Sequence, residues 1–241
     1  MKHQRESVTS VLLNTSTRPV TCQNLKTDLN VKFTNVRSIV NKIDFVKNYL
    51  SIHDTDLLFI TESWLTKDIL SSVVQCTGYN ILRCDRQTTG GGVLLLFKEG
   101  LQITEVTHTM NQNTTSDDFE VLCVDYYDGK QPNRLCCFYI PPRSSQSKEI
   151  IKDVCKTIEQ FQTCSKPFFV MGDFNLPKID WNNYTSQGGK SHELFLDFCV
   201  MNCFSQHVLE ATHEKGSTLD LLLCNVAAQS LLTSCDVLPP I

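Results

Sequence analysis

Apolar and polar positions change their period several times along the chain, and each period predicts a type of element. Short apolar runs, alternating or continuous, are typical of half-buried or fully buried strands. Such runs predict strands over residues 29–35, 55–62, 79–86, 90–100, 167–171 and 217–225, with a hairpin over 119–142. The Gly-rich segment 88–92 lacks the Gly-Lys-Ser/Thr of a phosphate-binding loop, so it predicts a tight turn into a strand.

Three segments carry apolar residues at helical spacing and predict amphipathic helices over residues 38–54, 144–161 and 190–204. Ser38 fits the N-cap position of the first helix. Helical segments connect some of the predicted strands, and hairpin turns connect others. This mixed order predicts an α/β fold whose sheets are covered by helices, rather than a doubly wound parallel sheet.

The chain length predicts how these elements are organised. With 241 residues, the chain is long enough for one sizeable α/β domain. Residues 1–28 are polar and lack a sustained period, so they predict a poorly ordered leader. Residues 29–241 hold the predicted elements and form the domain.

Net charge and cysteine content limit which ligands and which cell compartment suit the protein. A net charge of −4 argues against broad non-specific binding of nucleic acid, but it leaves room for a local basic groove. The 12 cysteines are scattered, form no CxxC motif and lie mostly inside apolar runs. This usage predicts reduced core thiols and an intracellular protein. We find no apolar run as long as the ~18 residues of a membrane helix and no secretory signal, so we expect no membrane association.

Polar residues stand at the ends of the predicted strands. They are Asn35, Glu62, Tyr139, Asp173 and Asn175, and Asp220 lies in a further strand. Each could have an ordinary structural role, as a turn residue, a cap or a salt-bridge partner. Asp173 and Asn175 are two residues apart, so both are predicted to project to one side of an extended chain. Strand ends converge on one crevice in many α/β proteins, and a group of carboxylates and amides there suits Mg²⁺ and a phosphate ester.

Six segments in order, "NVRSIVNKI", "LLFITESWL", "GGGVLLLF", "FYIPPRSS", "VMGDFNLPKIDW" and "STLDLLL", resemble the endonuclease/exonuclease/phosphatase superfamily. In detail they resemble the apurinic-type endonuclease domain of non-LTR (LINE-type) retrotransposons, over residues 29–238. The resemblance implies a DNase I-like, four-layer sandwich of two mixed β-sheets flanked by helices. It also implies Mg²⁺-dependent hydrolysis of a phosphodiester, with Mn²⁺ as a possible substitute.

The resemblance implies a role for each matching residue. Glu62 would hold the metal, with Asn35 beside it. Asp173 would align or deprotonate the attacking water. Asn175 and Tyr139 would bond phosphate oxygens, and Asp220 would orient a catalytic histidine. Arg143 could touch backbone phosphate or be an ordinary loop arginine, and Thr212 and Ser217 match a DNA-contacting loop.

The chain departs from the superfamily pattern after Asp220. A Ser-Asp-His motif is expected on a following strand, but no histidine follows His213. The sequence therefore predicts a fold that lacks its last strand and a chain with weak or no activity. The parent element would nick DNA to prime reverse transcription at its target site.

The partners implied are DNA and a reverse transcriptase domain in the parent element. Action on DNA would fit the nucleus, although no clear nuclear signal is present. Two other functions stay open. One is a non-catalytic retrotransposon remnant that binds DNA. The other is an abasic-site repair nuclease or phosphatase of the same superfamily.

Overall fold

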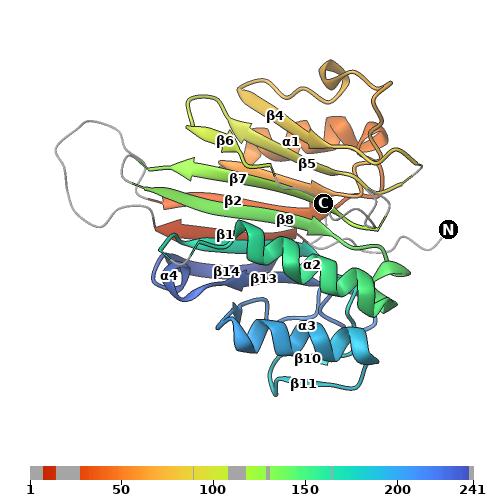
Figure 1. Cartoon of the computed structure of the whole chain (residues 1–241). Helices are drawn as coiled ribbons and strands as arrows, with labels where there is room; N and C mark the ends of the chain where they lie inside the picture. The colour runs from red at the N-terminus through yellow and green to blue at the C-terminus, as the bar shows by residue number, and fades with distance from the viewer. Residues whose placement is uncertain are drawn as a thin grey trace.

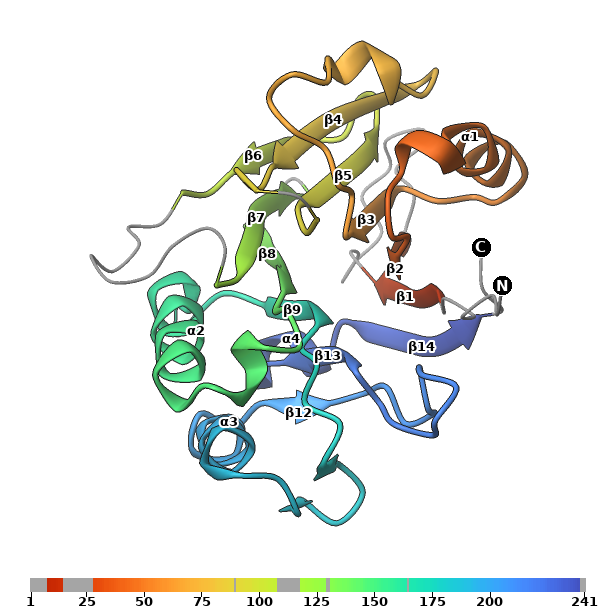
Figure 2. The ribbon, with the colours of Figure 1, turned by 90° about the vertical axis from the view of Figure 1, so that its right-hand side faces the viewer.

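Two six-stranded sheets lie face to face between outer helices (Figure 2). This architecture comes from a computed structural model, which describes residues 8–14, 28–88, 90–107, 118–128, 131–163 and 165–238. Each sheet contains one parallel pair, β2 with β3 and β8 with β9, among antiparallel neighbours. The sandwich of mixed sheets predicted from the sequence is therefore confirmed.

The first sheet has the strand order β14-β1-β2-β3-β5-β4, and the second has the order β12-β13-β9-β8-β7-β6 (Figure 1). The strands are β1 Val8–Asn14, β2 Asp28–Asn35, β3 Leu57–Thr61, β4 Tyr79–Cys84, β5 Val93–Lys98, β6 Ile103–Glu105, β7 Glu120–Tyr127, β8 Pro132–Tyr139, β9 Phe168–Asp173, β10 Ile179–Asp180, β11 Thr185–Ser186, β12 Ser205–Gln206, β13 Asp220–Cys224 and β14 Leu232–Leu238. The helices are α1 Ile43–Ile52, α2 Lys148–Phe161, α3 Lys190–Met201 and α4 Val226–Gln229, with 3₁₀ turns η1 Val40–Lys42, η2 Ser71–Val73 and η3 Ser144–Gln146. Strands β10 and β11 form a small separate hairpin.

Alternate residues of the central strands fill the space between the two sheets. The first sheet contributes Phe33 and Phe59, and the second contributes Cys137, Met171 and Leu222. The intervening residues pack outward under the helices, so β3 is buried along its whole length. Burial on both faces explains why these strands are continuous apolar runs in the sequence.

The outer faces are covered by amphipathic helices. α2 and α3 pack on the second sheet and α1 on the first. α2 begins at its N-cap Ser147, whose hydroxyl accepts a hydrogen bond from the Ile150 N–H. Ser38 is not the cap of α1, because a 3₁₀ turn precedes this helix and begins at Val40. Among the described residues, no helix is both long and apolar enough to span a membrane.

The N-terminal part of the chain differs from its predicted role as an unstructured leader. Residues 8–14 form β1, which pairs with β2 on one side and with β14 on the other. The apolar residues in this region have no sustained period in the sequence. Backbone hydrogen bonds to neighbours on both sides stabilise this strand, so it can form without a regular side-chain pattern.

The residues after β13 form a strand that the sequence did not predict, although it does not carry the Ser-Asp-His motif expected on the last strand of the fold. β14 follows β13 in the chain and pairs with β1 at the edge of the first sheet. Its residues Cys235 and Val237 pack against the core between the sheets, while Asp236 between them is exposed. The apolar residues Leu232, Cys235 and Val237 do not alternate strictly, so the sequence pattern did not predict this strand.

The cysteines behave as predicted within the described residues. Ten of them are free thiols, and most of these are buried in the cores. Cys203 is the exposed exception. Burial raises the pKa of the Cys137 and Cys199 thiols, which keeps them protonated and unreactive.

Candidate active site

The strand register collects polar residues into one row across the second sheet. Glu120, Tyr139, Asp173 and Asp220 are direct neighbours on β7, β8, β9 and β13. We call these four residues the polar row. They lie two residues beyond Leu122, Cys137, Met171 and Leu222, which are core residues, so the row continues the inward-facing side of the sheet. The polar row therefore marks the rim of the space between the sheets.

The facing sheet brings an amide and a carboxylate to the same rim. Asn35 is the last residue of β2, and Glu62 follows β3 directly. The Asn35 Nδ2 donates to Glu62 Oε1 at 2.9 Å and to Asp173 Oδ2 at 3.0 Å. One side chain thus joins the two sheets across 138 residues of sequence. We call the rim that carries Asn35, Glu62 and the polar row the site edge.

Three loops fix the backbone around Glu62. Its carbonyl accepts a hydrogen bond from the Ser38 N–H at 2.8 Å, and the Trp64 N–H donates to Gly91 O at 2.9 Å. Glu62 itself has φ of 50°, in the left-handed region that a residue other than glycine adopts only when its surroundings require it. The Trp64 indole N–H lies 3.4 Å from Glu62 Oε2. The Gly-rich turn thus supports the loop that carries the carboxylate.

The backbone after Asp173 differs from the prediction that Asp173 and Asn175 lie on an extended chain. Asn175 does not continue an extended chain, because its φ is 50° and its N–H donates to Asp173 Oδ1 at 3.2 Å. Aspartate accepts such a bond from the residue two positions on when a strand ends in a turn. The Asn175 amide instead holds the Ile140 carbonyl at 3.0 Å. The two side chains are still close to each other, but the turn brings them together.

Burial and like charges act on the site electrostatically. The pKa of Asp173 is raised above its ordinary value, first by burial and then by the charges of Asp220 and Glu62. Hydrogen bonds from Asn35 and Asn175 oppose this increase. The pKa of Tyr139 is also raised, by burial, by the charges of Glu62 and Asp173 and by a hydrogen bond to Glu62. The site edge therefore concentrates negative charge in a partly desolvated place.

The residues predicted as DNA contacts make no hydrogen bond to the Asn35, Glu62 and Asp173 side chains among those the structure gives, although Thr212 bonds the backbone of Asp220. Thr212 is buried, and its Oγ1 accepts the N–H groups of Leu219 and Asp220 at 3.0 and 3.1 Å. Ser217 accepts the N–H of Thr212 and of His213 through its carbonyl. Both residues hold the loop that precedes β13. Arg143 is exposed just before η3. Their roles as DNA contacts stay predictions.

The sequence did not predict a buried ion pair that the structure places in this region. Arg86 Nε donates to Glu120 Oε1, and these residues are only 8% and 2% exposed. The Arg86 Cζ lies 5.6 Å from the centre of the Tyr139 ring. An arginine just before a Gly-rich turn and a glutamate at the start of an apolar strand were the available signals. Nothing local in the sequence pairs them, because Arg86 follows β4 in the first sheet and Glu120 begins β7 in the second, so the packing of the two sheets brings them together.

β14 ends at the site edge. In the register, Leu238 pairs with Val8, and Val8 pairs with Thr34, the residue next to Asn35. Cys235, Asp236 and Val237 near this end of β14 do not form the Ser-Asp-His motif of the resemblance, and no histidine follows His213.

The donor set at the site edge suits a hard cation. Among the residues that the structure describes, no three Asp, Glu, His or Cys side chains are grouped so as to hold a metal ion by themselves. Glu62 and Asp173 nevertheless converge on one amide, and Mg²⁺ commonly takes one or two carboxylates and completes its shell with water and phosphate oxygens. Asn35 Oδ1 accepts the Arg37 N–H at 3.2 Å, which leaves it one lone pair, and its predicted place beside the metal stays a prediction.

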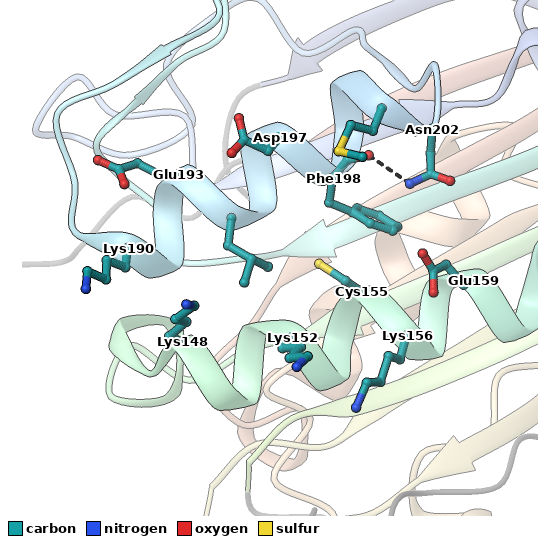
Figure 3. Close-up of a pocket in the computed structure, with 12 residues that line it drawn as sticks. Lys148, Lys152, Cys155, Lys156, Glu159, Lys190, Glu193, Asp197, Phe198 and Asn202 are labelled. Atoms are coloured by element: carbon teal, nitrogen blue, oxygen red, sulfur yellow. Dashed lines mark hydrogen bonds between the residues drawn. The ribbon is translucent and has the colours of Figure 1, made fainter.

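A second concave region is unrelated to these residues. A groove between α2 and α3 is lined by Lys148, Lys152, Cys155, Leu194 and Phe198, among others (Figure 3). It lies on the outer helical layer and contains none of the predicted site residues. The candidate active site is therefore the site edge.

Residues 133–238, from β8 to β14, match the sequence model of a family described as endonuclease-reverse transcriptase. Among curated proteins, none matches the chain. The match covers Tyr139, Asp173, Asn175 and Asp220 of the site edge.

Solved structures with the same architecture are enzymes of related kinds. The 3′ phosphatase NExo from Neisseria, bound to a product DNA hairpin, has a TM-score of 0.58 at 15% identity over 81% of this chain and 85% of its own. An AP endonuclease from Archaeoglobus fulgidus has a TM-score of 0.59 at 12% identity, over 80% and 84% of the two chains. The endonuclease domain of TRAS1, a telomere-specific non-LTR retrotransposon, has a TM-score of 0.54 at 11% identity, over 81% and 84%. The chain shares the fold of these proteins, and the family match over residues 133–238 agrees with the resemblance that the motifs give.

Proposed function

We propose that the site edge is the active site of a Mg²⁺-dependent phosphodiester hydrolase that nicks DNA, of the retrotransposon endonuclease type. The observation that carries the proposal is the Asn35 amide, which holds Glu62 and Asp173 together across the two sheets. Carboxylates brought together at such a rim are the ligands that Mg²⁺ prefers.

Glu62 is the residue that would hold the metal. Its carboxylate is fixed by Asn35 and lies on the strained loop between β3 and the Gly-rich turn. Bound Mg²⁺ would neutralise charge on the phosphate and on the leaving oxygen. Mn²⁺ would serve in its place because it accepts the same oxygen ligands.

Other residues of the chain would activate the water and bind the phosphate. Asp173 would align the attacking water and accept its proton, since the carboxylate is already held by Asn35 and by the Asn175 N–H. The Asn175 amide has a second hydrogen beyond the one bonded to Ile140 O, and it would donate this to a phosphate oxygen. Tyr139 would place its hydroxyl on the same phosphate.

DNA as the substrate is supported by two observations outside the site. The matched family is described as endonuclease-reverse transcriptase, and one structure of the same fold is named as the endonuclease domain of a retrotransposon. A reverse transcriptase domain would accordingly be the partner in the parent element. Abasic DNA is the competing substrate, and preferential cleavage of an abasic duplex over an intact duplex would favour it.

The rate should be low because no histidine follows His213, so the chain lacks the histidine that Asp220 would orient in the resemblance. This observation also favours a second candidate function, a DNA-binding module that does not cleave.

The test is relaxation of supercoiled plasmid by the 241-residue chain with Mg²⁺, beside the Glu62→Gln variant. We expect slow nicking that EDTA and Glu62→Gln both abolish. DNA binding that is unchanged by Glu62→Gln, without any nicking, would favour the binding module. Circular dichroism of both proteins controls for folding.

A further inference from the structure

Arg86 and Glu120 form a buried ion pair against the ring of Tyr139. Glu120 is the direct neighbour of Tyr139 in the register of β7 and β8. Arg86 bonds this glutamate and lies over the tyrosine ring, with its Cζ 5.6 Å from the ring centre. A guanidinium over an aromatic face is attracted to the ring, and more strongly when water is excluded. Arg86 thus contacts the face of the Tyr139 ring, and its partner Glu120 is fixed on the neighbouring strand β7.

The Gly-rich turn provides the space for this pair. A Cβ on Gly91 would lie 2.5 Å from Arg86 Nε and 2.7 Å from Glu120 Oε1, so any side chain there would push on the ion pair. The Gly91 carbonyl also accepts the Trp64 N–H in the loop of Glu62. One turn therefore supports both Arg86 and the carboxylate that Tyr139 contacts.

Tyr139 needs such support because of its surroundings. Its hydroxyl bonds Glu62, and Asp173 lies directly opposite it on β9. The ring itself lies in the core between the sheets. Small tilts of the ring would move the hydroxyl away from Glu62 and from the place of a phosphate.

We propose that Arg86 is a positioning residue, which with Glu120 holds the Tyr139 ring so that its hydroxyl stays at Glu62. This inference rests on the proposed function, since it explains how one phosphate-contacting group is kept in place. It assigns a role to the arginine and to the Gly-rich turn, neither of which contacts the phosphate itself.

The test is ¹⁹F NMR of the chain labelled with 3-fluorotyrosine, in metal-free buffer. The chain has six tyrosines, and the resonance that Tyr139→Phe removes belongs to Tyr139. Glu62→Gln should shift this resonance, because it changes the acceptor of the hydroxyl. In the Arg86→Met background we expect most of that response to be lost, since the hydroxyl is no longer held at residue 62.

Three further variants separate positioning from general stability. Arg86→Lys keeps a cation at the ring and should retain the response. Arg83→Met is the matched control and should also retain the response. Arg83 lies in β4, three residues before Arg86, and it bonds Asp85 and Thr66 O instead of contacting Tyr139. Gly91→Ala keeps both charges but displaces them, so it should weaken the response even if Arg86→Met fails to fold.

A full response to Glu62→Gln in Arg86→Met or in Gly91→Ala would overturn the proposal. The readout needs neither DNA nor metal. A wild-type chain that never nicks DNA would therefore count against the proposed function and leave this result standing.

Discussion

Asn35 is the residue on which the site edge depends. Its amide bonds carboxylates from both sheets, and its own carbonyl is held by the Arg37 N–H. Hydrogen bonds from an amide to charged acceptors contribute about 1.5–3 kcal/mol each when they are buried. Without them, Glu62 and Asp173 would repel each other at a place where burial already disfavours charge.

The raised pKa of Asp173 leads to a pH-dependent prediction. Asp173→Asn should increase the free energy of unfolding at pH 7 in metal-free buffer, because the amide brings no charge into a buried place beside Asp220 and Glu62. The native carboxyl binds its proton more tightly than the unfolded one. The wild type is therefore favoured at low pH and loses stability as the pH rises through the raised pKa.

Urea unfolding at a series of pH values measures this difference. The gap between the two proteins should close as the pH falls toward the ordinary aspartate value of about 3.9. Asp180→Asn is the matched control. Asp180 is exposed, and hydrogen bonds from Asn183 lower its pKa, so this change should bring no gain. A destabilised Asp173→Asn protein at pH 7 would contradict the account.

Metal binding at Glu62 predicts a change in thermal stability. Mg²⁺ at roughly ten times its Kd should stabilise the wild type by about 1.4 kcal/mol, because it binds the folded chain only. Glu62→Gln should remove this effect. The control Glu159→Gln changes an exposed glutamate on α2 and should respond to Mg²⁺ as the wild type does. Equal responses of Glu62→Gln and the control would argue against a metal at this site.

At the scale of the elements, β9 positions the site by packing closely on β8. Gly172 has φ of 137°, and a Cβ there would lie 1.9 Å from the Phe138 carbonyl oxygen. Backbone atoms, unlike the end of a flexible side chain, cannot move away from an added Cβ. The close approach of the two strands therefore sets where Asp173 and Tyr139 meet.

Gly172→Ala should lower the free energy of unfolding by about 3–5 kcal/mol, which is exceptional for a single substitution. Gly100→Ala is the matched control, because Gly100 also has a positive φ of 89° but no atom within 4 Å of its Cβ position. We expect a loss of only about 1–2 kcal/mol there, from backbone strain alone. Urea unfolding compares the two, and equal losses would show that the contact with Phe138 does not matter.

Across the whole molecule, the sequence predicted the parts in which local pattern and tertiary structure agree. Continuous apolar runs such as residues 57–61 became buried central strands, and helical spacing predicted α2 and α3. The polar ends of the strands predicted the convergence of Glu62 and Asp173, because strand ends meet at one rim.

The parts that could not be predicted depend on pairing between distant segments. β1 and β14 stabilise each other at a sheet edge, and their own side-chain patterns are weak. Arg86 follows β4 in the first sheet and meets Glu120 and Tyr139 of the second sheet only because the two sheets pack face to face. The turn at Asn175 depends on a hydrogen bond to Asp173, which has no signal in the periodicity.

The most direct test of the central claim is plasmid nicking with Mg²⁺ by the 241-residue chain and by the same chain extended by a strand that carries Ser-Asp-His. In the resemblance, Asp220 orients the histidine of that motif. We expect the extended chain to nick supercoiled DNA faster than the wild type, and Glu62→Gln in that background to abolish the gain. A folded extended chain that nicks no faster, or one whose nicking survives Glu62→Gln, would contradict the account.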